Sequence, residues 1–186
     1  MGELKTYERK RNFSVTPEPK PRKAKPGKRL RYVIQKHAAS SLHYDLRLEA
    51  RGVMKSWAVP KGPSLNPADR RLAVPTEDHP ISYNRFEGTI PAGEYGAGSV
   101  IVWDRGWYVS LSDASPERAI RDGAFKFEVH GEKLKGKFSL RHVGGGRNWI
   151  LVKMKDEHAH RSGDITKQRP ESVVTGRTIE QIARGA

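Results

Sequence analysis

The chain has 186 residues, of which 35 are Lys or Arg and 21 are Asp or Glu, for a formal net charge of +14. This length suits one domain with a hydrophobic core, and the charge predicts a polyanionic partner, with nucleic acid the first candidate. The absence of cysteine excludes disulfide scaffolds, cysteine zinc sites and thiol catalysis. The sequence has no apolar run of membrane-spanning length and no signal-peptide pattern, so we expect a cytoplasmic protein, monomeric and without a membrane partner.

Residues 1–29 are predicted to form a basic, proline-rich N-terminal arm. Residues 1–36 carry twelve Lys or Arg against three Asp or Glu, a net charge of +9. Prolines at positions 17, 19, 21 and 26 disfavour a helix and favour extended backbone. The composition therefore predicts an extended arm, and residues 20–28 are typical of a disordered solubilising tail.

Residues 30–155 are predicted to form a β-barrel domain, because short alternating segments are separated by Gly- and Pro-rich turns. The predicted strands cover residues 31–35, 43–49, 54–59, 71–74, 98–103, 125–129, 136–141 and 149–154. The segment Asp104-Arg105-Gly106 is expected to close one of them as a turn. Few helices are expected: one from Ser115-Pro116 to Gly123, and one capped by Thr178 in the polar C-terminal tail, residues 156–186. The pattern indicates a mainly β fold, with an antiparallel barrel preferred over a sandwich.

The segment from Leu42 to Glu49 alternates strictly, so its side chains point to two opposite faces of a strand. One face carries His43, Asp45, Arg47 and Glu49. A solvated polar face is the simplest interpretation of alternation alone. The residue types instead favour a site for a divalent metal beside an anion, with His37 close enough upstream to be a third ligand.

Other residues could complete such a site. His79 lies in a predicted loop, followed by Tyr83, and could donate to a phosphate or a leaving group. Lys61 and Arg71 are candidates for phosphate contacts, although a solvated surface role is the commoner one for either. With a metal on the histidines and Asp45, and Arg47 neutralising charge on phosphate oxygens, these residues would make a coherent phosphoesterase site.

Several segments resemble the phosphoesterase module of bacterial DNA ligase D. They are residues 35–37, 42–49, 55–64, 77–80, 86–91, 95–98 and 102–106, and the resemblance covers about residues 30–155. In the arm, residues 10–13 and 16–19 resemble the leading segment of the family. Without a polymerase or ligase domain, the chain resembles a stand-alone or excised member. The segment 171–178 resembles the linker that leads to the ligase domain.

The resemblance implies a β-barrel 3′-phosphoesterase that depends on a divalent metal, preferably Mn²⁺, with Co²⁺ or Zn²⁺ as alternatives. Such an enzyme removes a 3′-terminal ribonucleotide and then the 3′-phosphate from a DNA primer-template. The product is a 3′-OH end for ligation in non-homologous end joining. An end-joining polymerase and ligase are the implied protein partners.

The resemblance also implies roles for individual residues. The metal ligands are His37, His43 and Asp45, and the scissile phosphate is engaged by Arg47, His79 and Tyr83. Further active-site positions are Gln35, Lys61, Arg71 and Glu77, together with Arg11 and Glu18 in the arm. The chain departs from the family at Asn12, where Asp is usual, which predicts a weakened activity or a shifted balance between the diesterase and monoesterase steps.

Two other functions fit part of the pattern. His43 and Asp45 with a distant His142 would suit an iron-dependent oxygenase. A non-catalytic nucleic-acid-binding barrel would explain the charge and leave the histidines incidental. Alanine at His43 separates the hypotheses, because only the phosphoesterase would lose 3′-end processing while still binding DNA.

Overall fold

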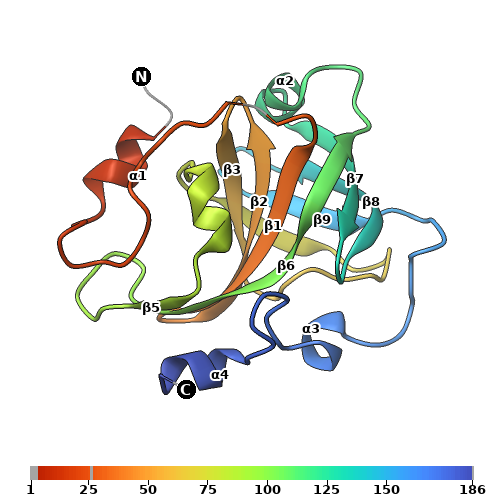
Figure 1. The fold of residues 1–186 in the computed structure, drawn as a ribbon. Helices are drawn as coiled ribbons and strands as arrows, with labels where there is room; N and C mark the ends of the chain where they lie inside the picture. Colours follow the sequence, from red (N-terminus) through yellow and green to blue (C-terminus); the bar gives the residue numbers. More distant parts are fainter. Residues whose placement is uncertain (1–3, 26, 186) are drawn as a thin grey trace.

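The computed structural model describes residues 4–25 and 27–185, and their strands form one antiparallel sheet (Figure 1). The strand order β1-β2-β3-β4-β9-β8-β7-β6 closes on itself, because β6 also pairs with β1. β5 pairs with the first residues of β6, outside the closed barrel. The prediction of a mainly β protein with an antiparallel barrel is confirmed. The strands are β1 (Leu30–Ala38), β2 (Leu42–Ala50), β3 (Val53–Val59), β4 (Arg71–Pro75), β5 (Gly88–Ile90), β6 (Gly98–Ser110), β7 (Ala124–Gly131), β8 (Lys135–His142) and β9 (Trp149–Lys153).

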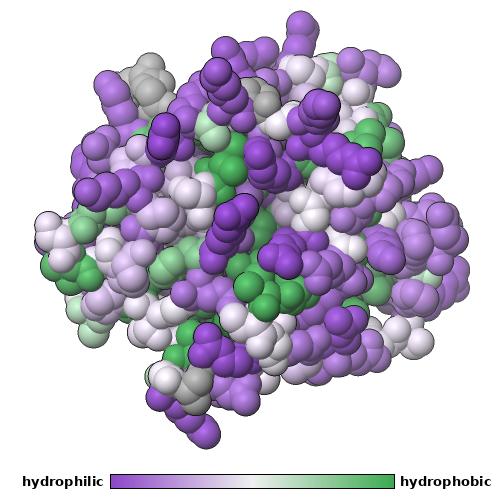
Figure 2. Space-filling view, viewed as in Figure 1, coloured by the Kyte–Doolittle hydropathy of each residue, from purple (hydrophilic) through white to green (hydrophobic). Residues whose placement is uncertain are grey.

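The barrel interior holds the main hydrophobic core. On β2, the inward residues Tyr44, Leu46 and Leu48 are buried in it, as the alternation predicts. Leu42 has the same parity but is 49% exposed at the start of the strand. Outside, hydrophilic side chains cover most of the face in Figure 2, with only small hydrophobic patches between them.

The prediction of a turn at Asp104-Arg105-Gly106 is wrong, because β6 continues through these residues to Ser110. The Asp104 carboxylate accepts backbone N–H groups from residues 132–134 and the hydroxyl of Tyr32. A Cβ on Gly106 would lie 2.1 Å from the carbonyl oxygen of His130. Asp104 and Gly106, for which the sequence predicts a turn, instead allow β6 to pass close to the backbone of residues 130–134.

Both predicted helices are present. Ser115 caps α2 (Pro116–Arg121), and Thr178 forms a capping box at α4 (Ile179–Ala183). The sequence did not predict the short elements α1 (Lys5–Arg9), η1 (Ile81–Arg85), α3 (Ile165–Gln168) and β5. Helices this short have little stability of their own, so tertiary contacts decide whether they form.

The N-terminal arm lies against the outside of the barrel and is only partly extended (Figure 1). Its helix α1 buries Tyr7 completely, and the Tyr7 hydroxyl donates to the carbonyl of Pro19 at 2.6 Å. Further along, the N–H of Ala24 donates to the carbonyl of Gly52. The expectation of an extended arm is therefore corrected for the described residues, while Pro26 lies outside them.

The C-terminal tail also packs on the barrel. Trp103 Nε1 donates to the carbonyl of Arg169 at 2.6 Å, and Lys133 Nζ donates to the carbonyls of Arg169 and Glu171. Burial lowers the pKa of Lys133 to about 8. Helix α4 adds Ile179 to a buried cluster on β6. In the described part of the chain, no helix has the length and apolar character needed to cross a membrane.

Candidate functional site

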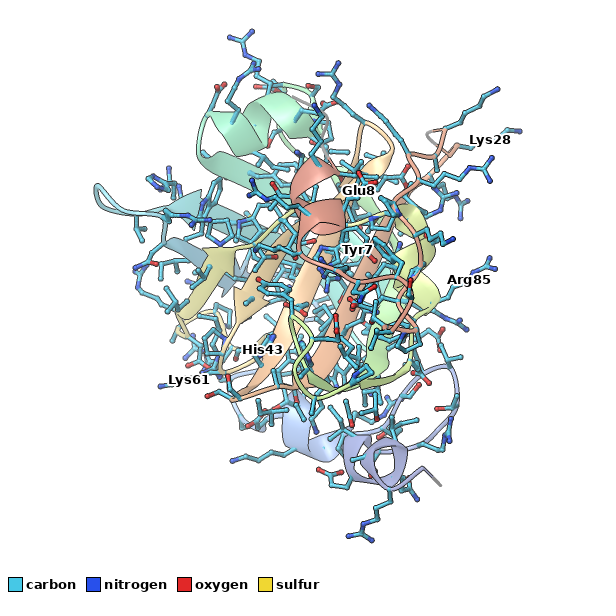
Figure 3. The ribbon with its side chains drawn as sticks, turned by 90° about the vertical axis from the view of Figure 1, so that its left-hand side faces the viewer. Tyr7, Glu8, Lys28, His43, Lys61 and Arg85 are labelled. Carbon is cyan, nitrogen blue, oxygen red and sulfur yellow. The ribbon has the colours of Figure 1, made fainter. Side chains whose placement is uncertain are left out.

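The candidate site lies on the outer face of β1, β2 and β3, where the arm and η1 cover the barrel wall (Figure 3). Asp45 and Arg47 point outward from β2, yet they are only 6% and 3% exposed. The polar face of β2 is therefore not simply solvated, because the N-terminal residues and the loop after β4 shield it.

Three potential metal ligands meet at the end of the β1–β2 hairpin. His37 on β1 is the cross-strand partner of His43 on β2, and Asp45 follows two residues later on the same face. One ligand atom from each side chain can be chosen so that all lie within 4.8 Å of one another. Asp45 lies 3.8 Å from His37 Nδ1 and 3.6 Å from His43 Nε2.

The remaining ring nitrogens of the histidines are held by backbone carbonyls. His37 Nε2 donates to Gly96 O at 2.8 Å, and His43 Nδ1 donates to Ser41 O at 2.9 Å. A carbonyl oxygen only accepts, so these contacts select the tautomers whose lone pairs face Asp45. This donor set fits a divalent transition metal bound by nitrogen and oxygen ligands.

Asp45 is charged at neutral pH. Burial raises the pKa of its carboxyl, but the adjacent Arg47 guanidinium lowers it, and the pKa lies below its ordinary value. Arg47 Nη2 donates to Asp45 at 3.1 Å. The carboxylate is therefore available as a ligand without needing a metal to deprotonate it.

Arg47 is held by four side chains around its guanidinium. Nε donates to Gln35 at 2.8 Å, Nη1 contacts Ser56 at 3.0 Å and His79 at 2.9 Å, and Nη2 donates to Asp45. Gln35 in turn donates to the carbonyl oxygens at both ends of the turn that follows Tyr83. Gln35 therefore positions both Arg47 and η1.

His79 lies between two guanidiniums. A β-bridge to Met54 fixes its backbone on β3. Its ring contacts Arg47 at Nδ1, and Arg11 at Nε2 over 3.3 Å. Burial lowers the pKa of His79, and Arg47 and Arg11 lower it further, to well below its ordinary value. His79 is therefore neutral at pH 7.

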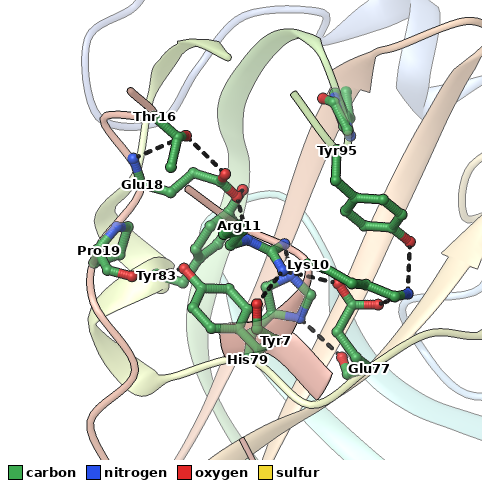
Figure 4. A network of polar contacts seen from close by, with 12 residues as sticks. Tyr7, Lys10, Arg11, Thr16, Glu18, Pro19, Glu77, His79, Tyr83 and Tyr95 are labelled. Carbon is green, nitrogen blue, oxygen red and sulfur yellow. Dashed lines mark hydrogen bonds and ion pairs between the residues drawn. The ribbon is translucent and has the colours of Figure 1, made fainter. Parts of the chain in front are cut away.

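The arm supplies the other side of the site (Figure 4). Arg11 donates from Nε to Glu18 at 2.8 Å and from Nη1 to Glu77 at 3.1 Å. Glu18 also accepts the hydroxyl of Tyr83 at 2.9 Å. Burial and the nearby Glu18 raise the pKa of Tyr83 well above its ordinary value, so its phenol stays protonated.

The structure gathers most of the predicted site residues in one pocket but not all of them. Gln35 lies behind Arg47, while Asn12 is exposed and accepts the N–H of Ser14. Lys61 and Arg71 line a different pocket, beside α3. The predicted residues that line the central pocket are Arg11, Glu18, His37, His43, Asp45, Arg47, Glu77, His79 and Tyr83.

Sequence reasoning assigned no role to Lys10 and Tyr95, although both belong to the site. Tyr95 lines the central pocket, and Lys10 Nζ donates both to its hydroxyl and to Glu77, each at 3.0 Å. Both residues lie in segments that resemble the family, which was the one available signal. Composition could not have identified them, because an exposed lysine and tyrosine are common on any surface.

Acid is expected to destabilise the fold through His79. Below about pH 6.5 the unfolded chain protonates this histidine and the folded chain does not, so the free energy of unfolding falls as pH falls, by about 1.4 kcal/mol per pH unit. Asp45 and Glu77, whose pKa values are lowered in the fold, add to the loss near pH 4. Urea denaturation in EDTA at pH 7 and pH 5 measures the slope.

The variant His79→Gln should flatten that slope between pH 6.5 and pH 5. The matched control is His158→Gln, because the side chain of His158 is 42% exposed. The control should keep the wild-type slope. Equal slopes for the two variants would contradict the assignment.

The structure defines a class of protein: a closed antiparallel β-barrel in which two histidines and a carboxylate that could hold a metal ion lie beside two buried guanidiniums. Residues 35–142 match the family model described as the DNA Ligase D 3′-phosphoesterase domain. The chain therefore belongs to this family.

Three relatives show how much of the chain the similarity covers. The multifunctional non-homologous end joining protein LigD of Pseudomonas aeruginosa is 52% identical over 95% of this chain. The protein of the same name from Mycolicibacterium smegmatis is 45% identical over 87% of it. The multifunctional non-homologous end joining DNA repair protein LigD of Mycobacterium tuberculosis is 44% identical over 83% of it. The chain spans only 22%, 22% and 20% of these relatives.

Proposed function

We propose that the chain is a metal-dependent 3′-phosphoesterase that heals DNA ends for non-homologous end joining. It removes a 3′-terminal ribonucleotide and then the 3′-phosphate, which leaves a 3′-OH. The observation that carries the proposal is the shared pocket: His37, His43 and Asp45 lie next to Arg11, Arg47 and His79. The family description supports a 3′-phosphoesterase, and the names of the relatives support a role in non-homologous end joining.

His37, His43 and Asp45 would hold the metal, and their donor atoms suit Mn²⁺, with Co²⁺ and Zn²⁺ as alternatives. We propose Mn²⁺ as the preferred ion, in keeping with the family. A divalent ion bound here supplies Lewis acidity toward a phosphate ester and lowers the pKa of water.

The two arginines are prepared to bind a phosphate. Within the protein, Arg11 uses Nε, both N–H groups of Nη1 and one N–H of Nη2. Arg47 donates from Nε to Gln35, from Nη1 to Ser56 and from Nη2 to Asp45. Each therefore keeps one Nη2 N–H for a phosphate oxygen. Because their other donors are already committed, Arg11 and Arg47 need little reorganisation to stabilise charge on the non-bridging oxygens.

His79 can couple protonation to substrate binding. Between two guanidiniums it is neutral, but an anion bound beside it raises its pKa. A phosphate held by Arg11 and Arg47 would favour a proton on His79, which could then pass to the departing oxygen. The aromatic ring of Tyr83 packs edge-on against His79 and supports the orientation of the imidazole.

The oxygenase hypothesis lacks its ligand set. His142 lies on β8, where Nε2 bonds the carbonyl oxygen of Gly146, and it does not join the group of His43 and Asp45. A non-catalytic nucleic-acid-binding barrel remains the alternative, favoured by the net charge of +14.

The proposed reaction can be followed on a labelled primer-template with a 3′-terminal ribonucleotide or a 3′-phosphate. We expect a 3′-OH product from both substrates in Mn²⁺, none in EDTA, and none from the His43→Ala variant. Unchanged ends with every divalent metal, while DNA is still bound, would instead identify a binding barrel.

Metal binding has its own readout in the melting temperature. At about 100 times its dissociation constant, Mn²⁺ should stabilise the fold by about 2.7 kcal/mol. The variant Asp45→Asn should lose this shift, whereas Asp156→Asn, which changes a carboxylate bonded to Lys153 and outside the pocket, should keep it. The same shift in Asp45→Asn would place the ion elsewhere.

A further inference from the structure

Tyr95 presents an aromatic ring at the edge of the central pocket. It lies in the loop between β5 and β6 and is 48% exposed. Lys10 Nζ bonds its hydroxyl and lies 4.3 Å from the ring centroid, while Lys10 itself is paired with Glu77 (Figure 4). The next residue, Gly96, accepts the hydrogen bond that orients His37. The ring is thus held in place close to a proposed metal ligand, in a residue that remains exposed.

Next to Tyr95 the central pocket opens into an uncharged hollow. The two share Ala39, Ile90 and Gly96, and the hollow extends along the β1–β2 turn to Ala92 and Ala97. The described residues that line it carry no charge. The described lining of the hollow offers no cation to bind a phosphate. The sugar and base of a nucleoside are uncharged, so moving them from water into the hollow costs little desolvation free energy.

Another surface near the metal ligands is cationic. Lys36, Lys61, Arg71 and Lys167 line a separate pocket in which Asp164 is the one acidic residue of the described lining, and Arg71 is also paired with Asp69 at 3.1 Å. Leu42 and Tyr44, the neighbours of His43 in the chain, belong to that lining. In Figure 3 the side chains of His43 and Lys61 lie on the same lower part of the molecule. A DNA strand, with one phosphate per nucleotide, is attracted to such a surface.

We propose that Tyr95 stacks on the base of the 3′-terminal nucleotide, which occupies the uncharged hollow, while the primer strand runs over the cationic pocket. This assignment rests on the proposed function and adds the direction of the strand. In the diesterase step, water adds to phosphorus, the bond to O5′ of the terminal nucleoside breaks, and O5′ takes a proton. The nucleoside released is the part that Tyr95 contacts, and a 3′-phosphate end lacks it.

The proposal predicts a selective loss in Tyr95→Leu. Base–aromatic stacking is worth enough to lower the ratio of kcat/KM for ribonucleotide release to kcat/KM for phosphate removal by about ten-fold. Tyr95→Phe keeps the ring and loses only the contact with Lys10, so its ratio should match that of the wild type. A substrate whose terminal ribose lacks a base should give the same ratio with all three proteins.

The outcomes separate this inference from the function on which it rests. If the wild type processes neither end, the proposed function fails. If it processes both ends and Tyr95→Leu keeps the wild-type ratio, the stacking assignment is overturned. If the ratio for Tyr95→Phe falls as far as the ratio for Tyr95→Leu, the effect comes from the hydroxyl contact with Lys10 and not from the ring. That result also overturns the stacking assignment. Equal melting temperatures for the three proteins would exclude a folding defect.

Discussion

Replacing Arg47 with methionine is expected to lower the free energy of unfolding by about 3–5 kcal/mol, because the buried groups that bond its guanidinium would lose their partner. Asp45 would lose its closest cation, and Gln35 and Ser56 would lose a donor. Urea denaturation at pH 7 without metal measures the change. Since Arg47 also faces the proposed phosphate, 3′-end processing should fall with it.

The matched control is Arg105→Met. Arg105 pairs with Glu132 at 2.9 Å, a distance similar to that between Arg47 and Asp45, but both side chains of the control pair are 49% exposed. Exposed pairs contribute at most about 1 kcal/mol, so this variant should be close to the wild type in stability. Equal losses in the two variants would show that burial does not set the importance of Arg47.

Arg47 also links stability to metal binding. Burial raises the pKa of Asp45, and Arg47 provides the largest opposing influence. Without the guanidinium, the pKa of the carboxyl would rise, and protons would compete with a metal for it at higher pH. One side chain thereby keeps the ligand charged, orients His79 and faces the phosphate.

The face of β2 that carries the site could be predicted because a strand alternates with period two. The tight hairpin then places His37 directly across from His43, so local strand geometry is enough to bring the three potential metal ligands together. The burial of Asp45 could not be predicted this way. It depends on the N-terminal residues and the loop after β4, which are distant in the chain.

The path of the N-terminal arm could not be predicted from the sequence. Its prolines predicted extended backbone, and only the family resemblance pointed to Arg11 and Glu18. In the structure, Tyr7 is buried against Tyr83 and bonds the carbonyl of Pro19, which folds the arm back over the site. Lys61 belongs to a separate pocket for a related reason, since the path of the chain after β3 decides it.

The arm is expected to provide a catalytic cation as well as a cover. In Arg11→Met, 3′-end processing should fall by about 10²–10³-fold, the loss that follows removal of one donor to a developing anion. Stability should fall too, because Glu18 and Glu77 would remain buried, with side chains 0% and 3% exposed, and without their shared cation.

A second variant separates these two effects of Arg11. The double variant Arg11→Met/Glu77→Gln removes one of the orphaned charges, so its melting temperature should rise above that of Arg11→Met. The amide oxygen of the glutamine at position 77 would still accept a hydrogen bond from the Lys10 ammonium, and the arm would stay attached. Because no guanidinium would face the phosphate from this side, processing should stay as low as in the single variant. Recovery of activity together with stability would mean that Arg11 only holds the arm closed, and that Arg47 provides the charge the reaction needs.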